Sequence, residues 1–329
     1  ARRCQRCVVD LRFPTSHPAP HPSAMSYQFL TFDVTDRIAT ITVNRPDKLN
    51  ALNDATIAEL GVAIDEANAR DDVGAVLLTG AGRAFVAGAD ISELESQSPL
   101  EAQRRARAGQ VIFRRFETSP KPTIAAINGF ALGGGCELAV YSSRRVVAME
   151  SYIGLVEVGV GLVPGAGGLT YIARRAAARA QSTSSNDLLP FLTEGFTAAA
   201  MAKVGTSAYE SRDLDYLLDS DCIVMHKDEV LAVALNEVRA MAFNGYRAPL
   251  PARFKVAGRT GIATILGQLV NMRDGGFISA HDFHIAREIA TVVCGGDGQF
   301  GGAAGDVLLR DKAGRRGAKG VRVFVRSRE

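Results

Sequence analysis

Two glutamates, Glu137 and Glu157, stand twenty residues apart, and each lies in glycine-rich sequence. Glu137 follows the triple glycine at 133–135, and Glu157 precedes a second glycine-rich stretch at residues 164–168. A pair of carboxyl groups can act as acid and base on one small substrate. Neighbouring glycines let backbone N–H groups approach a ligand, because no Cβ stands in the way. Spacing alone leaves a plainer interpretation open, in which the glycines only make tight turns and the glutamates are solvated.

The elements that must position these glutamates can be predicted from apolar patterning. Residues 73–79 and 123–128 are apolar runs of the length of a buried strand, and the second leads towards the triple glycine. Residues 99–117 have helical spacing between the two runs, and residues 134–143 should form a helix directly after the glycines. This alternation of strands and helices predicts an α/β domain built from stacked turns of the βαβ type.

The flanking sequence adds a hairpin before this alternation and helices after it. Residues 29–34 and 37–43 alternate apolar and polar side chains about a short turn, which predicts a β-hairpin. Asp54 is placed to cap the helix that follows. Beyond Gly168 the pattern is mainly helical, for example at residues 227–242. We therefore expect an α/β core with a helical C-terminal region.

Three further segments, read in order with the two glutamates, resemble one known family. They are Asn-Arg-Pro-Asp-Lys-Leu-Asn-Ala-Leu at 44–52, Phe-Val-Ala-Gly-Ala-Asp-Ile at 85–91, and Ile-Ala-Ala-Ile-Asn-Gly-Phe-Ala-Leu at 124–132. From about residue 27 to about residue 242 the chain resembles the crotonase (enoyl-CoA hydratase/isomerase) superfamily. Residues 250–297 are more similar to the hydratase region of bifunctional 3-hydroxyacyl-CoA dehydrogenase/enoyl-CoA hydratase proteins. The resemblance implies a crotonase-like core of stacked ββα-type turns.

The resemblance also implies an activity, the addition of water to the 2,3 double bond of a trans-2-enoyl-CoA thioester. It implies that the backbone N–H groups of Ala89 and Gly134 form an oxyanion hole for the thioester oxygen. Glu137 would then orient and deprotonate the water, and Glu157 would supply the proton to Cα. The residues agree physically, since Ala89 follows a glycine in a loop and Gly134 stands where a helix begins.

The same resemblance implies where the coenzyme A part of the substrate would bind. No metal ion and no separate cofactor are expected. Gly165 is expected either to support Glu157 or to line the pocket, and Lys48 could equally be an ordinary solvated lysine. The residues implied to bind the substrate are Lys48, Leu49, Ala87, Asp90, Ile91 and Gly165.

Other functions of the same fold stay open at this point. A Δ3-Δ2-enoyl-CoA isomerase can work with one base, so the presence of two glutamates disfavours it. A non-catalytic crotonase-fold protein that binds RNA is a second alternative, with the basic C-terminal tail as an arm. An inactive chain is a third.

Charge and composition limit the class of protein. The whole chain carries +3, the first 24 residues +3 and the last 20 residues +6, so residues 25–309 carry −6. A mildly acidic body argues against a nucleic-acid-binding face on the main domain. No segment is expected to span a membrane, and the five cysteines suggest no disulfide framework. A cytoplasmic protein, or less readily a mitochondrial matrix protein, fits this composition, and the family implies a homotrimer or hexamer.

Several motifs are set aside. Residues 296–301 match G-x-G-x-x-G after an apolar run, but only 28 residues follow, too few for half of a dinucleotide-binding domain. His281 and His284 have helical spacing but no cysteine or glutamate partners, so a structural or surface role is favoured over a metal site. The lone C-x-x-C at residues 4–7 is treated as chance.

The expected organisation of the chain has four parts. Residues 1–24 are a disordered extension, and residues 25–205 are the crotonase-like core that contains the active site. Residues 206–297 form the helical C-terminal region, and residues 298–329 are a glycine-rich basic tail, also expected to be disordered.

Overall fold

The computed structural model of the chain describes residues 26–94, 97–185, 187–250 and 254–296. The expected extension 1–24 and tail 298–329 lie outside these residues. No helix within the described ranges has the length and apolar character needed to cross a bilayer.

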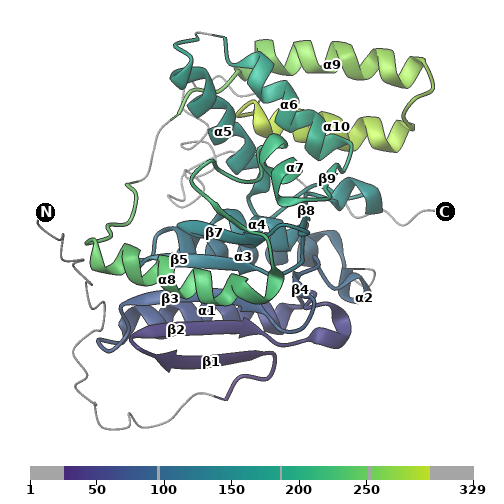
Figure 1. Cartoon of the computed structure of the whole chain (residues 1–329). Coiled ribbons are helices and arrows are strands. Elements are labelled where there is room, and N and C mark those ends of the chain that lie inside the picture. Colours follow the sequence, from purple (N-terminus) through teal and green to yellow (C-terminus); the bar gives the residue numbers. More distant parts are fainter. Residues whose placement is uncertain (1–25, 95–96, 186, 251–253, 297–329) are drawn as a thin grey trace, which may run out of the picture.

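Two sheets carry the α/β part of the molecule (Figure 1). The first has six strands in the order β1-β2-β3-β5-β7-β10, antiparallel between β1 and β2 and parallel elsewhere. Its strands are β1 (Leu30–Thr35), β2 (Ile38–Val43), β3 (Ala75–Gly80), β5 (Thr123–Ile127), β7 (Arg144–Ala148) and β10 (Cys222–Val224). The second has four, β4 (Ala84–Val86), β6 (Phe130–Leu132), β8 (Tyr152–Gly154) and β9 (Val204–Gly205).

From β3 to β8, consecutive strands alternate between the two sheets. The chain passes from β3 to β4, from β5 to β6 and from β7 to β8, each time leaving the larger sheet for the smaller one. Helices follow the first two of these pairs, α2 (Ile91–Leu94) and α3 (Pro99–Glu117) after β4, and α4 (Gly134–Val140) after β6. The prediction of stacked ββα-type turns is confirmed. Within the small sheet, β4, β6 and β8 run parallel, so their carboxyl ends share one edge.

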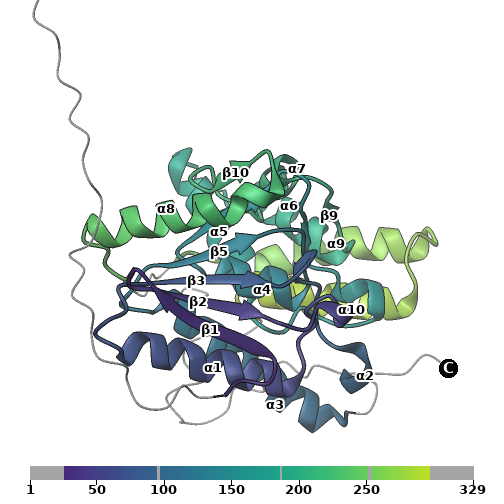
Figure 2. The same ribbon diagram turned by 60° about the horizontal axis from the view of Figure 1, so that its bottom comes forward.

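Helices cover both faces of the larger sheet. Figure 2 shows α8 (Val230–Phe243) on one side of its strands and α1 (Asp54–Ala69) and α3 on the other. Val230, Ala234 and Val238 of α8 are buried in one apolar cluster with residues of β3, β5 and β7.

On α1, the side chain of Asn53 accepts a hydrogen bond from Thr56 N at 2.8 Å, so Asn53 is the cap. The predicted cap, Asp54, is the first residue inside the helix.

The C-terminal region is helical, as predicted. It contains α5 (Gly168–Ser182), α6 (Leu189–Ala200), α7 (Ala208–Asp213), α9 (Gly258–Asp274) and α10 (Ala280–Val293). In Figure 1 the pair α9 and α10 lies beside α6, to the right of α5, and their buried apolar residues belong to the same core as those of α1 and α4. Short 3-10 helices η1 (Pro46–Lys48), η2 (Glu157–Val160) and η3 (Lys227–Glu229) complete the chain. The helix predicted at 134–143 ends earlier, at Val140.

Candidate active site

The carboxyl ends of β4 and β6 bring the two predicted N–H donors to one edge of the small sheet. Ala89 follows β4 through Gly88, whose φ is +102°, and Gly134 follows β6 through Gly133, whose φ is +50°. A Cβ on Gly88 would lie 3.5 Å from the carbonyl oxygen of Leu132, so the two loops touch. Within the described residues, neither Ala89 N–H nor Gly134 N–H donates to a backbone oxygen. Both groups can therefore serve a ligand.

The triple glycine also packs a helix closely, which was the competing interpretation of this motif. A Cβ on Gly135 would lie 2.0 Å from the carbonyl oxygen of Val86, so α4 rests directly on the backbone of β4. A side chain at Gly133 would need a left-handed backbone, which L residues rarely adopt. Gly133 therefore makes the turn and Gly135 the close approach, and both roles place Gly134 at the start of α4.

Glu137 lies on α4 with only 2% of its surface exposed. Its Oε1 accepts hydrogen bonds from Ala166 N at 2.8 Å and from Gly168 N at 2.9 Å. Burial raises the pKa of Glu137 to about 7, against the opposing effect of these backbone donors. The loop at 165–168 thus holds Glu137. The expectation that Gly165 supports Glu157 finds no such contact within the described residues.

Glu157 is the first residue of η2. A Cβ on Gly133 would lie 3.1 Å from Glu157 Oε1, so this carboxyl group lies directly beside the turn that leads to Gly134. Its Oε2 is buried and has no hydrogen-bond partner within the described residues. Burial, and then the charge of Glu137, raise the pKa of Glu157 well above its usual range. Two carboxyl groups in different environments therefore share this site.

Several residues predicted to contact coenzyme A also come together here. Ala87 N donates to Leu49 O at 3.1 Å, and the exposed Lys48 ends the adjoining η1. Leu49 and the buried Asn50 both have left-handed backbones, with φ of 50° and 60°. Asn50 Nδ2 donates to the carbonyl oxygens of Ala81 at 2.9 Å and Ala84 at 2.7 Å, which ties this loop to β4.

The carboxylate of Asp90 is bound by other side chains of the protein. Its carboxylate lies 2.9 Å from Arg45 Nη2 and accepts a hydrogen bond from Ser92 Oγ at 2.7 Å. These two partners, Ser92 first, lower the pKa of Asp90. The side chain of Ile91 is 54% exposed. Asp90 therefore anchors the loop through its side chain, whereas Ile91 offers an apolar surface.

Arg45 and Asn50 were not predicted from the sequence. Both stand in the segment 44–52 that carried the family resemblance. For Asn50 the available signal was a polar residue between the apolar Leu49 and Ala51. It could not show that Asn50 would be fully buried, because its acceptors lie 31 and 34 residues further along the chain.

The motifs set aside have these outcomes. The match at 296–301 lies mostly outside the described residues, and the apolar run before it is the end of α10, a helix. His281 Nε2 lies 3.3 Å from the carbonyl oxygen of Gly161, and His284 is exposed. Across the described residues, no three histidine, cysteine or acidic side chains gather closely enough to hold a metal ion.

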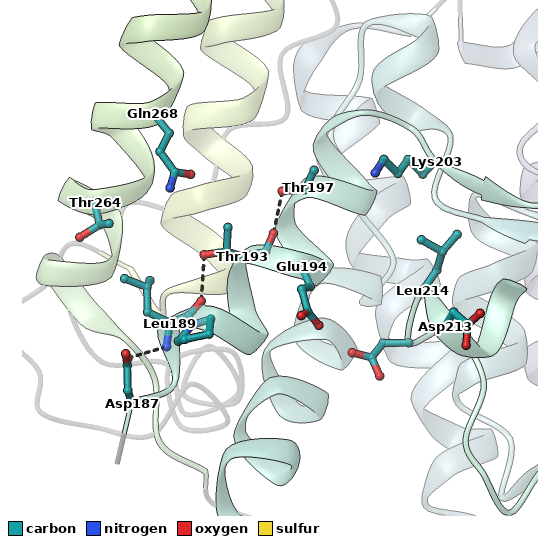
Figure 3. Close-up of a pocket in the computed structure, with 12 residues that line it drawn as sticks. Asp187, Leu189, Thr193, Glu194, Thr197, Lys203, Asp213, Leu214, Thr264 and Gln268 are labelled. Carbon is teal, nitrogen blue, oxygen red and sulfur yellow. Dashed lines mark hydrogen bonds between the residues drawn. The ribbon is translucent and has the colours of Figure 1, made fainter. Parts of the chain in front are cut away.

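A hollow of about 600 Å³ lies among α6, α7 and α9, and none of the predicted site residues lines it (Figure 3). The hydroxyls of Thr193 and Thr197 donate to carbonyl oxygens one turn earlier in α6. Glu194 and Asp215 are both paired with Arg179. Most polar groups that line the hollow are therefore already bonded to other groups of the protein.

Several known proteins are similar to this chain. The family described as enoyl-CoA hydratase/isomerase matches residues 33–205. The short-chain-enoyl-CoA hydratase of Clostridium acetobutylicum is 46% identical over 139 residues, which are 42% of this chain and 53% of that protein. A "Probable 3-hydroxyacyl-CoA dehydrogenase" of Bacillus subtilis is 35% identical over 224 residues, 67% of this chain and 28% of that protein. The match therefore spans about half of the hydratase and about a quarter of the dehydrogenase.

The fold agrees as well. The crystal structure of an enoyl-CoA hydratase from Bacillus anthracis has a TM-score of 0.56 at 24% identity, covering 80% of this chain and 89% of that one. The match to the dehydrogenase also fits the similarity of residues 250–297 to bifunctional proteins. The family model covers more than half of the chain. The chain belongs to the enoyl-CoA hydratase/isomerase family, of the crotonase superfamily.

Proposed function

We propose that the protein is an enoyl-CoA hydratase, which adds water across the 2,3 double bond of trans-2-enoyl-CoA thioesters in fatty-acid or related acyl-CoA metabolism. The observation that supports this most is the pair of buried carboxyl groups beside two N–H groups that donate to no backbone oxygen in the described part of the chain. The name of the Clostridium acetobutylicum relative agrees with it.

In the proposed reaction the N–H groups of Ala89 and Gly134 bind the thioester oxygen, where negative charge develops as water adds. Preorganised donors of this kind stabilise the charge with little reorganisation. Glu137, with a pKa of about 7, is partly ionised at neutral pH and takes a proton from the attacking water. The oxygen of that water bonds to Cβ. Glu157, whose pKa is high, delivers a proton to Cα.

The two carboxyl groups exchange protonation states during one addition of water, so the reaction needs no external acid or base. Glu137 ends protonated and Glu157 ionised, and a proton returned from Glu137 to Glu157 restores the starting state. Because the charge of Glu137 raises the pKa of Glu157, their protons are best assigned to the pair.

The nucleotide end of the substrate is proposed to pass along Lys48, Leu49, Ala87 and Ile91, with Asp90 fixing the loop and Gly165 near the pocket wall. Coenzyme A enters only as part of the substrate, and the mechanism uses no metal or redox cofactor. A homotrimer or hexamer and a cytoplasmic location complete the proposal, and sedimentation would test the assembly.

The test is the loss of the conjugated-enoyl absorbance of crotonyl-CoA. The wild type should consume it, and Glu137→Gln and Glu157→Gln should each lower kcat by about 10²–10⁴-fold, the usual contribution of a positioned acid or base. Glu150→Gln, at an exposed glutamate, is the control and should keep full activity. A folded wild type that hydrates neither crotonyl-CoA nor longer enoyl-CoAs would rule the proposal out.

A further inference from the structure

Arg105, on α3, places its guanidinium group beside oxygen atoms of two other segments, residues 52–54 and α2. Its Nη2 donates to the carbonyl oxygen of Leu52 at 2.8 Å. Its Nε lies 3.0 Å from Asp54 Oδ1, and its Nη1 lies 3.2 Å from Glu93 Oε2. The Arg105 side chain is only 9% exposed, whereas the side chains of Asp54 and Glu93 are 64% and 37% exposed. The buried part of the contact is therefore the charged hydrogen bond to Leu52 O, which fixes that carbonyl group more firmly than an exposed ion pair would.

Leu52, the residue that Arg105 holds, is paired with the loop that carries Ala89. Leu52 N donates to Gly88 O at 2.8 Å, and Leu52 O accepts from Asp90 N at 2.8 Å, which makes a parallel bridge opposite Ala89. Leu52 also reaches the second donor, since a Cβ on Gly134 would lie 3.3 Å from Leu52 Cδ1. The backbone of Leu52 therefore fixes the loop that carries Ala89, and its side chain lies against Gly134.

We propose that Arg105 is a positioning residue for the oxyanion hole, acting on Ala89 through the carbonyl group of Leu52. This inference rests on the proposed function, because it assumes that Ala89 N–H binds the thioester oxygen. Without the guanidinium group, Leu52 O loses its charged donor, and the carboxylates of Asp54 and Glu93 lose the cation between them. The bridge to Gly88 and Asp90 then loosens, and Ala89 N–H loses its fixed direction.

The competing explanation is that Arg105 only holds α3 against its neighbours and has no effect on the oxyanion hole. A second arginine of α3 serves as the control for this explanation. Arg115 Nη1 lies 3.3 Å from the carbonyl oxygen of Gly61 and 2.5 Å from Asp65 Oδ2. It thus binds the same helix, α1, through one carbonyl oxygen and one carboxylate. These acceptors lie within α1 and have no hydrogen bond to the 87–90 loop in the described structure.

The test compares Arg105→Met, Arg105→Lys and Arg115→Met. One readout is kcat and KM with crotonyl-CoA. The other is the infrared carbonyl band of bound butanoyl-CoA, which has no double bond to hydrate. Hydrogen bonds from the oxyanion hole should move this band to lower frequency in the wild type. Arg105→Met should return it towards its position in solution and lower kcat about ten- to a hundredfold, less than the 10²–10³-fold typical of a lost donor, with a smaller change in KM.

Arg115→Met should leave the band and kcat at their wild-type values. If Arg105→Met does not fold, Arg105→Lys replaces it, because a lysine keeps the charge but cannot reach three acceptors with a fixed fork. An unchanged band in the folded Arg105 variant would overturn the positioning role. A wild type that shifts the band but hydrates no enoyl-CoA would refute the proposed function alone. The carbonyl band of butanoyl-CoA bound to the Arg105 variant would still decide the positioning role.

Discussion

At the scale of single residues, two glutamates of identical chemistry acquire different properties from their surroundings. Glu137 accepts two backbone hydrogen bonds, which partly offset its burial, whereas Glu157 has a buried oxygen without a partner in the described structure. The sequence predicted this pair, because glycines and spacing are local features. It did not predict Arg45, Asn50 or Arg105, since their roles depend on acceptors that folding brings from elsewhere in the chain.

The pH dependence of hydration should reflect this difference. The base must be ionised, so kcat/KM should rise with pH through about 7, the pKa of Glu137. The acid must be protonated, so kcat/KM should fall again where Glu157 loses its proton, at a pH well above the usual range for a glutamate. Measurement of kcat/KM with crotonyl-CoA from about pH 5 to 10 checks both limbs, which belong to the coupled pair. A profile that is flat through neutral pH would contradict the assignment.

The stability of the protein should show the cost of the buried Glu157 carboxyl group. Its pKa is raised in the folded state, so the unfolded chain ionises first, and stability is lost as pH rises towards the folded pKa. Glu157→Gln removes this ionisation. Its melting temperature should therefore exceed that of the wild type by a margin that grows from about pH 5 to pH 9. Glu150→Gln is the control, and a margin independent of pH would argue against a buried, titrating Glu157.

At the scale of elements, close approach of backbones decides where α4 lies, and so where its glutamate and its first N–H group point. The sequence indicated a helix after the glycines but not its contact with β4. A glycine indicates that another segment packs closely, but it does not identify that segment. The cap of α1 shows the same limit: Asn53 and Asp54 are both good caps, and only the backbone path selects Asn53.

Alanine substitutions at two buried helical glycines should have opposite effects. In Gly135→Ala the new methyl group would meet Val86 O at 2.0 Å, so α4 must shift, at a cost of about 1–3 kcal/mol or more. In Gly109→Ala, within α3, the nearest atom is Ala166 Cβ at 3.7 Å, an ordinary contact. That change should stabilise the helix by about 0.5–1 kcal/mol. Thermal melts check both, and equal melting temperatures would refute the account of α4 packing.

At the scale of the whole molecule, one apolar core extends from the first hairpin to the last described helix. Leu30 of β1, Leu138 of α4 and Ile289 of α10 are all buried in it. Beyond the predicted boundary at residue 205, β10 pairs with β7 of the large sheet. Periodicity predicted the helical region but not its docking, because an apolar stripe does not identify the surface that covers it. The division at residue 205 remains a prediction about the chain, and unfolding can test it.

A continuous core predicts that the α/β part and the C-terminal helices unfold together. Ile289 is fully buried in α10, so Ile289→Ala should cost about 2–5 kcal/mol, whereas Phe277→Ala removes a side chain that is 80% exposed and should change little. If the regions are coupled, Ile289→Ala lowers the temperature at which helix circular dichroism and hydratase activity are lost, and the two curves stay coincident. Loss of helix signal well below the loss of activity would instead show that residues 206–297 unfold as a separate unit, because the site residues all lie before residue 169.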